Sequence, residues 1–498
     1  MKCRTLTGIT AMTLFVALVM PVWTTAQDNP SPEHKPKHQQ YKLLDLGTLG
    51  GPNSFVNGSP PPMINNQGTV AGEADISVMC AYLPSAGLAS PGFKWQNGSL
   101  SSIGTIGNGC FNLPNAISSN GTIAGAGDIG VIDPIYGPLG HAYVWRNGQI
   151  VDLGTFGGPF SLANAVNNRG QATGGAENTD PDLWNFGGLV GLPSPTAWHG
   201  FLWQGGILTD LGTLGGPDSA GVVINESGQI TGFSFTNDVP NPTTGIPTVD
   251  PFLWHRGRMT DLGTLGGTFG VGNAVNNGGQ VVGFSDLTGD LANHAFVWER
   301  GVLTDIGTLG GVNSTANWIN DAGQVVGSAN LPDGTHHAFV WWNGKMTDLG
   351  TIGSDPCSNG FHINSSGQVV GTTADCHGTV LHAYLWEQGS MLDLNAFIGP
   401  DFTSVEPIAI SDAGKIVGNG VLSNGDVHAV VLKPDGDCDS NCENRIAASQ
   451  NSAAAAAQTA GSSNTAVRKR TPSTSLERLR NQMKQRYHIP GQPTGPRD

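Results

Sequence analysis

The segment Asp45-Leu46-Gly47-Thr48-Leu49-Gly50-Gly51 decides the fold, because it returns along the whole chain. Near copies begin at Ser102, Asp152, Asp210, Asp261, Asp305, Asp348 and Asp393, at intervals of 43 to 58 residues. Periods of about 40 to 50 residues are typical of propellers, solenoids and repeat arrays. The sequence therefore indicates one structural unit copied eight times.

Each unit contains four short β-rich runs separated by turn signals. In the copy at residues 272–307 the runs are 273–276, 280–283, 294–298 and 302–307. Asn276-Asn277-Gly278-Gly279 separates the first two runs, because the Asn side chain can close an Asx-turn and Gly accepts a left-handed backbone. No stretch has a helical period long enough to compete. The sequence predicts an all-β protein made of four-stranded sheets.

Both faces of each predicted sheet are largely apolar. Around the turn at Asn147-Gly148, alternation places Tyr143 and Trp145 on one face and Val144 and Val151 on the other. A sheet that is apolar on both faces must be covered on both. We therefore expect neighbouring units to stack against each other.

The two ends of the repeat region complement each other. It starts with the run 41–47, which has no sheet of its own, and finishes with only three runs, 407–410, 415–418 and 428–432. Pairing the first run with the last would complete the eighth sheet and hide an open edge. We predict a closed β-propeller of eight four-stranded blades, in which the N-terminal strand completes the last blade. An open array and a seven-bladed ring are the alternatives.

The first 26 residues have the features of a secretory signal peptide. Lys2 and Arg4 precede an apolar run at 12–23 and the exit Thr24-Thr25-Ala26. A membrane anchor is the alternative, but the run is shorter than the roughly 20 residues that a span needs. We predict a signal peptide at 1–26, a linker at 27–40, a propeller at 41–434 and a low-complexity tail at 435–498. The protein would be secreted, extracellular or at the cell surface, with the periplasm as an alternative, and without a transmembrane anchor once the signal is removed.

Composition and cysteine usage agree with export. The formal net charge of −15 argues against a nucleic-acid partner, which needs a basic surface. Six cysteines remain after the signal peptide, and an even number in an exported chain suggests disulfides. From their places in loops and crossing segments we predict the pairs Cys80–Cys110, Cys357–Cys376 and Cys438–Cys442.

One five-residue motif resembles a known family. His294-Ala295-Phe296-Val297-Trp298 returns with small changes at His141, His337 and His382, each followed by Asp-Leu-Gly or a near copy. In this the chain, over about residues 41–434, resembles the HAF family of bacterial extracellular repeats. The resemblance implies an exported repeat protein without an established biochemical activity. The first unit departs from the pattern because Pro91 stands where His is expected, and the last has Leu432 in place of Trp.

The recurring His, Asp and Trp residues are expected to be structural. A single active site cannot need a copy in nearly every unit, and His141 would lie diagonal to Asp152 on a covered face, where a hydrogen bond satisfies both. The repeated Trp positions are interpreted as packing residues, with sugar stacking as the alternative.

Function is better sought where the units differ. The loops between the second and third runs are long in the first four units, at about 74–90, 126–140, 176–198 and 234–250. The candidate ligand-binding residues in them are Tyr82, Tyr136, Asp180, Asp182, Trp184, Phe186, Trp198 and Phe235. Aromatic rings beside acids on a rigid scaffold suit a carbohydrate, a peptide or a cation-bearing ligand. The alternative is that the loops are insertions without a ligand.

The tail at 435–498 contains only weak candidates for a functional site. Asp435, Asp437 and Asp439 resemble the start of a calcium loop, but Ser440 and Ile446 stand where the loop needs Gly and Glu. A polar turn closed by Cys438 and Cys442 is the alternative. Residues 475–487 could form a short basic helix or a solvated end. The chain has no nucleotide-binding, zincin or hydrolase motif, and no cofactor is predicted.

Two functions remain open. We expect a non-enzymatic binding or scaffolding module with an extracellular carbohydrate or protein ligand on the loops of the first four units. The alternative is a secreted carbohydrate-active enzyme, a glycoside hydrolase or a polysaccharide lyase, on the same scaffold. A carboxylate or His cluster particular to one unit, with perturbed pKa values, would favour the enzyme, whereas an aromatic shelf without such a cluster would favour binding.

Overall fold

The computed structural model describes residues 39–58, 62–184, 196–242 and 245–449. Strands β1 to β32 dominate these residues, with short 3-10 helices at Pro84–Ala86 and Leu394–Phe397. No helix within the described ranges is long and apolar enough to cross a membrane. The predicted signal peptide, most of the linker and the basic segment at 475–487 lie outside the described residues.

The strands form seven or eight four-stranded antiparallel sheets, which we number in chain order. Sheet 1 contains β2 (Ser54–Phe55), β3 (Val70–Ala74), β4 (Gly92–Gln96) and β5 (Ser99–Gly104). Sheet 2 contains β6 (Asn112–Ile117), β7 (Ile123–Asp133), β8 (Gly137–Arg146) and β9 (Gln149–Gly154). Sheet 3 contains β10 (Ser161–Val166), β11 (Ala172–Pro181), β12 (Thr196–Gln204) and β13 (Ile207–Asp210). Sheet 4 contains β14 (Ser219–Ile224), β15 (Ile230–Phe235), β16 (Val249–His255) and β17 (Arg258–Asp261).

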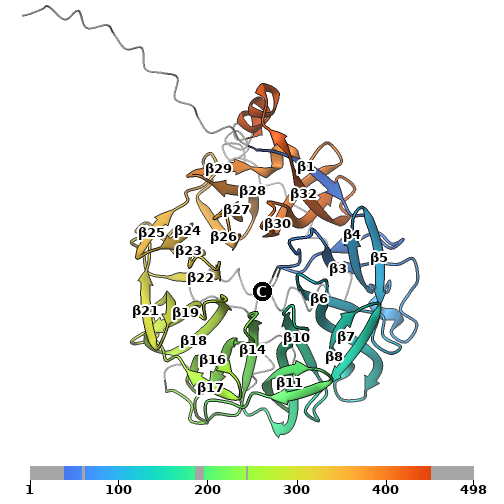
Figure 1. The fold of residues 1–498 in the computed structure, drawn as a ribbon, viewed down its shortest axis with the longest axis vertical. Helices are drawn as coiled ribbons and strands as arrows, with labels where there is room; N and C mark the ends of the chain where they lie inside the picture. The colour runs from blue at the N-terminus through green and yellow to red at the C-terminus, as the bar shows by residue number, and fades with distance from the viewer. Residues whose placement is uncertain (1–38, 59–61, 185–195, 243–244, 450–498) are drawn as a thin grey trace, which may run out of the picture. The chain divides into compact units, whose positions relative to one another are not determined.

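The remaining sheets repeat this order along the chain (Figure 1). Sheet 5 contains β18 (Gly266–Val275), β19 (Val281–Leu287), β20 (Asn293–Glu299) and β21 (Val302–Gly307). Sheet 6 contains β22 (Ser314–Ile319), β23 (Val325–Asn330), β24 (His336–Trp342) and β25 (Lys345–Asp348). Sheet 7 contains β26 (Cys357–Ile363), β27 (Val369–Ala374), β28 (Val380–Glu387) and β29 (Ser390–Asp393). Sheet 8 contains β30 (Phe402–Ile410), β31 (Ile416–Leu422), β32 (Val427–Asp437) and β1 (Gln39–Asp45).

The count is seven or eight because sheets 4 and 5 touch at a single parallel bridge. Val249 in β16 pairs with Phe269 in β18, so the two can be taken as one eight-stranded sheet or as two four-stranded sheets.

The predicted pairing of the first strand with the last is confirmed. β1 runs antiparallel to β32, with Lys42 opposite Lys433 and Asp45 opposite Val430. Figure 1 shows the blue β1 beside the orange β32 although the whole repeat region separates them in the sequence. The ordered sheet extends to Asp437, and residues 440–449 are helical, so the fold continues past the predicted boundary at residue 434.

The turn between the first two strands of a sheet forms as the sequence predicts. In sheet 5 the amide of Gly279 donates to the carbonyl of Asn276 at 3.0 Å, and the amide of Gln280 donates to Oδ1 of Asn276 at 3.0 Å. Gly279 has a φ of 80°, the left-handed conformation that favours glycine. The Nδ2 of the same Asn276 donates to the carbonyl of Asn320 in the next turn at 3.1 Å. One side chain therefore closes its own turn and ties its sheet to the next.

Asn residues on the first strands add a second set of links. Asn273 sits at an irregularity of β18, where the register shifts between Gly272 and Ala274. Its Nδ2 donates to the carbonyl of Ala316 on the first strand of sheet 6 at 2.8 Å. Equivalent bonds start from Asn115, Asn164 and Asn317. A bulge frees one side chain from the ladder, and here that side chain bonds the neighbouring sheet.

The core lies between successive sheets, as predicted from the two apolar faces. Phe296 of sheet 5 packs with Leu253 and Val223 of sheet 4. On the other face of sheet 5, Val282 and Val297 pack with Phe339 of sheet 6. Each sheet therefore buries both faces against its neighbours in the chain.

The three predicted disulfides are confirmed. Cys80–Cys110, Cys357–Cys376 and Cys438–Cys442 are bonded, with Cα–Cα distances of 5.5, 5.2 and 5.3 Å. Cys438 and Cys442 also pack in the core cluster that contains Tyr41 of β1. The last disulfide therefore anchors the end of the ordered chain to the sheet that β1 completes.

Candidate functional site

Five sheets carry a His–Asp pair at equivalent positions. The His lies near the start of the third strand and the Asp near the end of the fourth. In each pair Nδ1 of the His lies 2.7 to 3.0 Å from a carboxylate oxygen. The pairs are His141–Asp152, His199–Asp210, His294–Asp305, His337–Asp348 and His428–Asp45. The same Asp accepts the amide two residues later, for example Gly307 on Asp305 at 2.7 Å, so each pair supports the local fold.

These pairs are electrostatically satisfied. Burial raises the pKa of Asp152, but the hydrogen bonds from His141 and from the amide of Gly154 lower it more, so the net pKa lies below its usual range. The carboxylate is therefore ionised at neutral pH and has an imidazole beside it. The expected structural role of the repeated His and Asp accords with this geometry.

Sheet 4 departs from this pattern. Asp250 in β16 stands at the position that His occupies in those five sheets, and its neighbour on β17 is Asp261. The two carboxyl groups share a hydrogen bond. Asp250 is 8% exposed, whereas Asp261 is an exposed residue. Within the described residues Oδ1 of Asp250 is buried without a hydrogen-bond partner.

The carboxyl group of Asp250 keeps its proton to neutral pH. Burial, followed by the negative charge of Asp261 and the hydrogen bond from Asp261, raises its pKa to about 7. Two carboxylates in contact cannot both ionise easily, so the pair holds one proton.

A second departure lies just before β14. The amide of Trp198 donates to Oδ1 of Asp218 at 2.7 Å, and Oδ2 of Asp218 is buried without a partner among the described residues. In sheets 1 and 6 the equivalent acceptor is the side-chain amide of an Asn. Oδ1 of Asn53 accepts the backbone amide of Val427 at 3.1 Å, and Oδ1 of Asn313 accepts the backbone amide of Asn293 at 3.0 Å. Asp218 thus occupies the place of an Asn.

The pKa of Asp218 is also raised, to about 7. Burial is the main cause, the amide of Trp198 acts in the opposite direction, and the charge of Asp182 raises the pKa again. Asp286 at the end of β19 has its pKa raised to about 6 by burial and by Asp290.

Asp218, Asp250 and Asp286 all lie at the ends of strands where the loops between second and third strands emerge, which we call the loop face. The loop face of sheets 4 and 5 therefore carries three carboxyl groups with raised pKa.

Asp128 and Glu177, also on the loop face, have structural roles. Asp128 accepts the amides of Cys110 and Phe111 and the hydroxyl of Tyr82. Glu177 accepts the amide of Phe160 at 3.1 Å and the hydroxyl of Thr196 at 3.0 Å. These acids hold the crossing segments against the strands.

The structure does not gather the predicted aromatic residues into a shelf. Trp198 and Phe235 are fully buried and pack together in the core with Phe160 and Val249. Trp184 is half-buried beside this cluster, with its amide donating to Asp182 at 3.0 Å. Phe186 lies outside the described residues.

The other predicted residues lie apart from this cluster. Tyr82 is bonded to Asp128, as described above. Tyr136 is 36% exposed at the tip of the β7–β8 hairpin, where its amide donates to Asp133. Asp180 is exposed next to Asn178.

The tail carboxylates have other roles. Asp435 and Asp437 lie exposed on β32, and Oδ1 of Asp439 accepts the amide of Cys442 at 2.8 Å at the start of the helix 440–449. In the described ranges these three acids do not bring their oxygens together as a metal cluster would.

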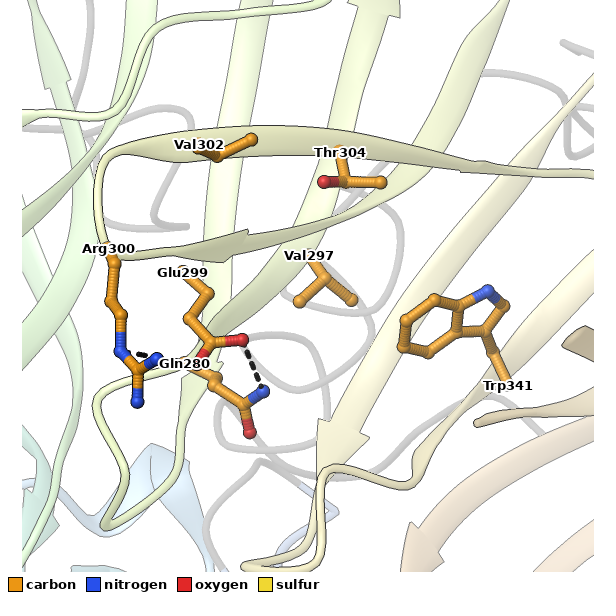
Figure 2. A pocket seen from close by; sticks show the side chains of 7 residues that line it. All are labelled: Gln280, Val297, Glu299, Arg300, Val302, Thr304 and Trp341. Carbon is orange, nitrogen blue, oxygen red and sulfur yellow. Dashed lines mark hydrogen bonds and ion pairs between the residues drawn. The ribbon is translucent and has the colours of Figure 1, made fainter. Parts of the chain in front are cut away.

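A shallow groove of about 310 Å³ lies between the outer strands of sheets 5 and 6. Figure 2 shows Trp341 on one side and Glu299 and Arg300 on the other, with Gln280 donating to Glu299 at 3.1 Å. Glu299 is the only carboxylate among the residues that line this groove, so it offers an aromatic and polar surface without an acid–base pair.

No family model matches the chain, and no curated protein is similar to it. Solved structures of similar architecture include the β-propeller domain of the Trilobed protease from Pyrococcus furiosus, at 10% identity and a TM-score of 0.40 over 70% of this chain and 100% of that one. A Trypanosoma rangeli sialidase matches at 10% identity and a TM-score of 0.31, over 81% of this chain and 63% of that one. Porphyromonas gingivalis dipeptidyl peptidase 4 matches at 9% identity and a TM-score of 0.34, over 83% of this chain and 62% of that one. The chain is all-β and resembles β-propeller structures.

These findings correct the functional expectation. The three similar structures come from proteins named as a protease, a sialidase and a peptidase, so the comparisons do not support the prediction of a non-enzymatic module. The chain spans less than two thirds of the sialidase and of the peptidase. Identities of about 10% assign no substrate or reaction to this chain, so any reaction must be argued from its own residues.

Proposed function

We propose that the protein is a secreted carbohydrate-active enzyme in which Asp250 and Asp261 act together as the acid–base group. The observation that carries this proposal is the carboxyl pair of sheet 4, at the position where five other sheets have a His–Asp pair. The His–Asp pair already fills the structural role at this position. We therefore attribute its replacement by two Asp residues in sheet 4 to function.

The pair has the properties that proton transfer needs. Asp250 is buried and holds a proton near neutral pH, while Asp261 is exposed and can meet a substrate. An acid–base group works best when its pKa is close to the working pH. The protonated pair can donate to a leaving oxygen, and the ionised pair can accept a proton from water or from a sugar carbon.

The pair acts as one group rather than as two opposed catalysts. Carboxyl groups in hydrogen-bond contact lie closer than the roughly 5 to 9.5 Å that separates the two carboxyl groups of glycoside hydrolases. A hydrolase would therefore need a further carboxylate, for which the loop face offers Asp218 and Asp286. A lyase would need only one group to remove a proton next to a sugar carboxylate.

Aromatic and acidic residues elsewhere on the loop face are compatible with a carbohydrate substrate. Tyr136 and the half-buried Trp184 lie on the loop face of sheets 2 and 3, together with the exposed Asp180. Aromatic rings beside polar groups suit sugars, which present both apolar and hydroxylated surfaces.

The test uses the repeat itself to supply a folded control. Purified protein is incubated with a panel of neutral and acidic polysaccharides, and reducing ends and unsaturated products are measured. Asp250→His installs the His–Asp pair found in five sheets, so it should fold normally and lose at least about 100-fold of any activity, the lower range for an acid–base catalyst. Full activity in folded Asp250→His protein would refute the assignment of the pair.

We also propose that the eight sheets close into an eight-bladed ring. The pairing of β1 with β32 supports it, as do contacts between the last sheet and the first. The side chain of Asn419 bonds both the amide and the carbonyl of Val56, at 2.8 and 2.9 Å, and Asn66 bonds Asp412 at 2.6 Å. Deleting residues 39–47 should lower the melting temperature far more than deleting 450–498, and equal effects would contradict closure.

Export and membership of the HAF family remain our proposals. The three disulfides support an oxidising compartment. N-terminal sequencing of protein recovered from the culture medium or periplasm should begin after Ala26, and an intact N-terminus in cytosolic protein would contradict export.

A further inference from the structure

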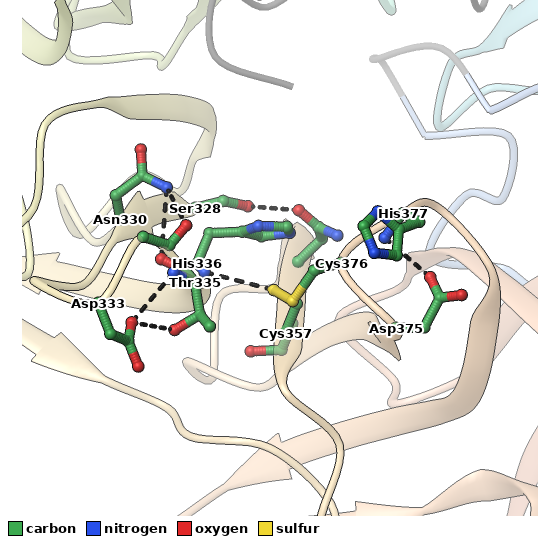
Figure 3. Close-up of a disulfide and its surroundings, with 12 residues drawn as sticks. Ser328, Asn330, Asp333, Thr335, His336, Cys357, Asp375, Cys376 and His377 are labelled. Carbon is green, nitrogen blue, oxygen red and sulfur yellow. Dashed lines mark hydrogen bonds between the residues drawn. A yellow bond between two sulfur atoms is a disulfide. The ribbon is translucent and has the colours of Figure 1, made fainter. Parts of the chain in front are cut away.

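Three metal-type ligands meet between sheets 6 and 7. His336 begins β24, Cys357 begins β26, and Cys376 lies in the loop after β27. Nitrogen and sulfur atoms of these three residues all lie within 4.8 Å of one another. Figure 3 shows the three side by side, with His377 on the far side of Cys376 from His336. In this structure the two sulfur atoms are joined as a disulfide.

Two of the three residues, His336 and Cys357, differ from the residues at the equivalent positions of other sheets. The amide of His336 donates to Sγ of Cys357 at 3.4 Å, the place where Asn53 and Asn313 serve as acceptors in sheets 1 and 6. The residues that donate to Asn53 and Asn313 are Val427 of sheet 8 and Asn293 of sheet 5, neither of which carries an imidazole. The scaffold therefore requires neither a cysteine nor a histidine at this junction.

The imidazole of His336 has one ring nitrogen that makes no hydrogen bond among the described residues. Its Nε2 is buried and has no hydrogen-bond partner within the described part of the chain. A buried polar atom without a partner calls for an explanation. An imidazole nitrogen is a common metal ligand, and one nitrogen of this ring lies within 4.8 Å of both sulfur atoms.

We propose that reduction of the Cys357–Cys376 disulfide creates a site for a thiophilic divalent cation such as Zn²⁺, held by both thiolates and the His336 imidazole. Two sulfurs and one nitrogen are a set that zinc accepts, and three protein ligands leave a fourth position for water or an external group. Because the sulfurs are either bonded to each other or available to the metal, the disulfide and the bound cation exclude each other.

The redox step balances with an external dithiol. The dithiol attacks the disulfide, supplies two electrons and two protons to the cysteines, and becomes a cyclic disulfide itself. Binding of the cation then displaces the thiol protons to solvent. An oxidant that takes two electrons from the thiolates reforms the disulfide and releases the metal.

Cys80 and Cys110 provide the matched control. They also join a loop to a crossing segment by a disulfide, 30 residues apart in sequence. Among the described residues no third His, Cys, Asp or Glu atom completes a cluster with them. Reduction should therefore give this pair a weaker site than the pair beside His336.

The test titrates Co²⁺, a coloured substitute for Zn²⁺, into the full chain. In one variant Cys80, Cys110, Cys438 and Cys442 are replaced by Ala, leaving only Cys357 and Cys376, and the protein is reduced by a dithiol that is then removed without oxygen. We expect one equivalent of Co²⁺ with thiolate charge-transfer absorbance, displaced by Zn²⁺, and no binding before reduction. His336→Asn should weaken binding by at least about tenfold, a change of about 1.4 kcal/mol, and His377→Asn should not.

Three results would overturn the proposal. The first is equal Co²⁺ binding before and after reduction. The second is equal affinity in a variant that retains only Cys80 and Cys110. The third is unchanged affinity when His336→Asn is added to the variant that keeps only Cys357 and Cys376, with folding checked by circular dichroism before reduction.

Discussion

Sheets 4 and 5 have the same four-strand order and the same turn chemistry, yet differ at one pair of side chains. Sheet 5 sets His294 against Asp305 at 2.8 Å, whereas sheet 4 sets Asp250 against Asp261. The first pair joins an imidazole to a carboxyl group, whereas the second brings two carboxyl groups together, which must share a proton. In a repeat protein each sheet is an internal control for the others, so a costly departure at one position indicates a role outside the scaffold.

The largest expected effect tests whether the two sheets are comparable at all. Phe252 and Phe296 are equivalent, fully buried residues on the third strands. Changing either to Ala should lower the free energy of unfolding by about 3 to 5 kcal/mol, as for other buried aromatic rings. Denaturant unfolding of both variants should agree within about 1 kcal/mol. A larger gap would mean that the scaffolds of the two sheets differ, and sheet 5 could no longer serve as the reference.

The next prediction exchanges the two pairs. His294→Asp would place a second carboxylate beside the exposed Asp305 and should lower the free energy of unfolding by about 1 kcal/mol at pH 8, since two negative charges near the surface repel each other. Asp250→His in sheet 4 should have the opposite effect and raise the free energy of unfolding. Thermal unfolding of both variants at pH 8 measures the exchange. Destabilisation by Asp250→His would show that sheet 4 cannot hold the common pair.

A pH series isolates the proton on Asp250. Its pKa is raised from 3.8 to about 7 in the folded protein, so the folded state holds a proton that the unfolded state loses as pH rises. The free energy of unfolding of the wild-type protein, measured relative to Asp250→Asn, should therefore fall between about pH 4 and pH 7. Below and above this range the difference between the two proteins should not change with pH. Unfolding measured from pH 4 to pH 8 should show this slope, and parallel curves would contradict it.

The smallest effect concerns the acceptor before the first strand. Asp218→Asn should stabilise the protein at pH 8 by about 1 kcal/mol, because an amide accepts the Trp198 amide without burying a charge. The converse change Asn313→Asp should destabilise by a similar amount. At pH 4 the carboxyl group of Asp218 is protonated, so the effect of Asp218→Asn should vanish. Equal effects at pH 4 and pH 8 would point to packing rather than charge.

Much of the fold could be predicted because it depends on local chemistry that the repeat multiplies. The Asn-x-x-Gly turns, the alternation of apolar faces and the unpaired end strands each have a direct physical meaning. The pairing of Tyr41 to Asp45 with β32 followed from counting strands, and the disulfides followed from placing cysteines in loops.

The site was harder to predict because strand ends could not be located from the sequence. Trp198 was assigned to a loop, but β12 begins at Thr196, so the indole points into the core. Phe235 is likewise the last residue of β15. The substitution of Asp250 for His was visible in the repeat, yet its raised pKa depends on burial that only the folded structure provides.

Infrared spectroscopy of Asp250 tests the central claim most directly, because it requires no knowledge of the substrate. At pH 6 the wild-type protein should show more protonated-carboxyl absorbance than Asp250→Asn or Asp250→His, in which only the contributions of other acids such as Asp218 and Asp286 remain. This difference should disappear as the pH rises through about 7, the pKa of Asp250 beside Asp261. If wild-type and Asp250→Asn spectra show the same carboxyl bands from pH 5 to pH 9, the pair holds no shared proton and the acid–base assignment is wrong.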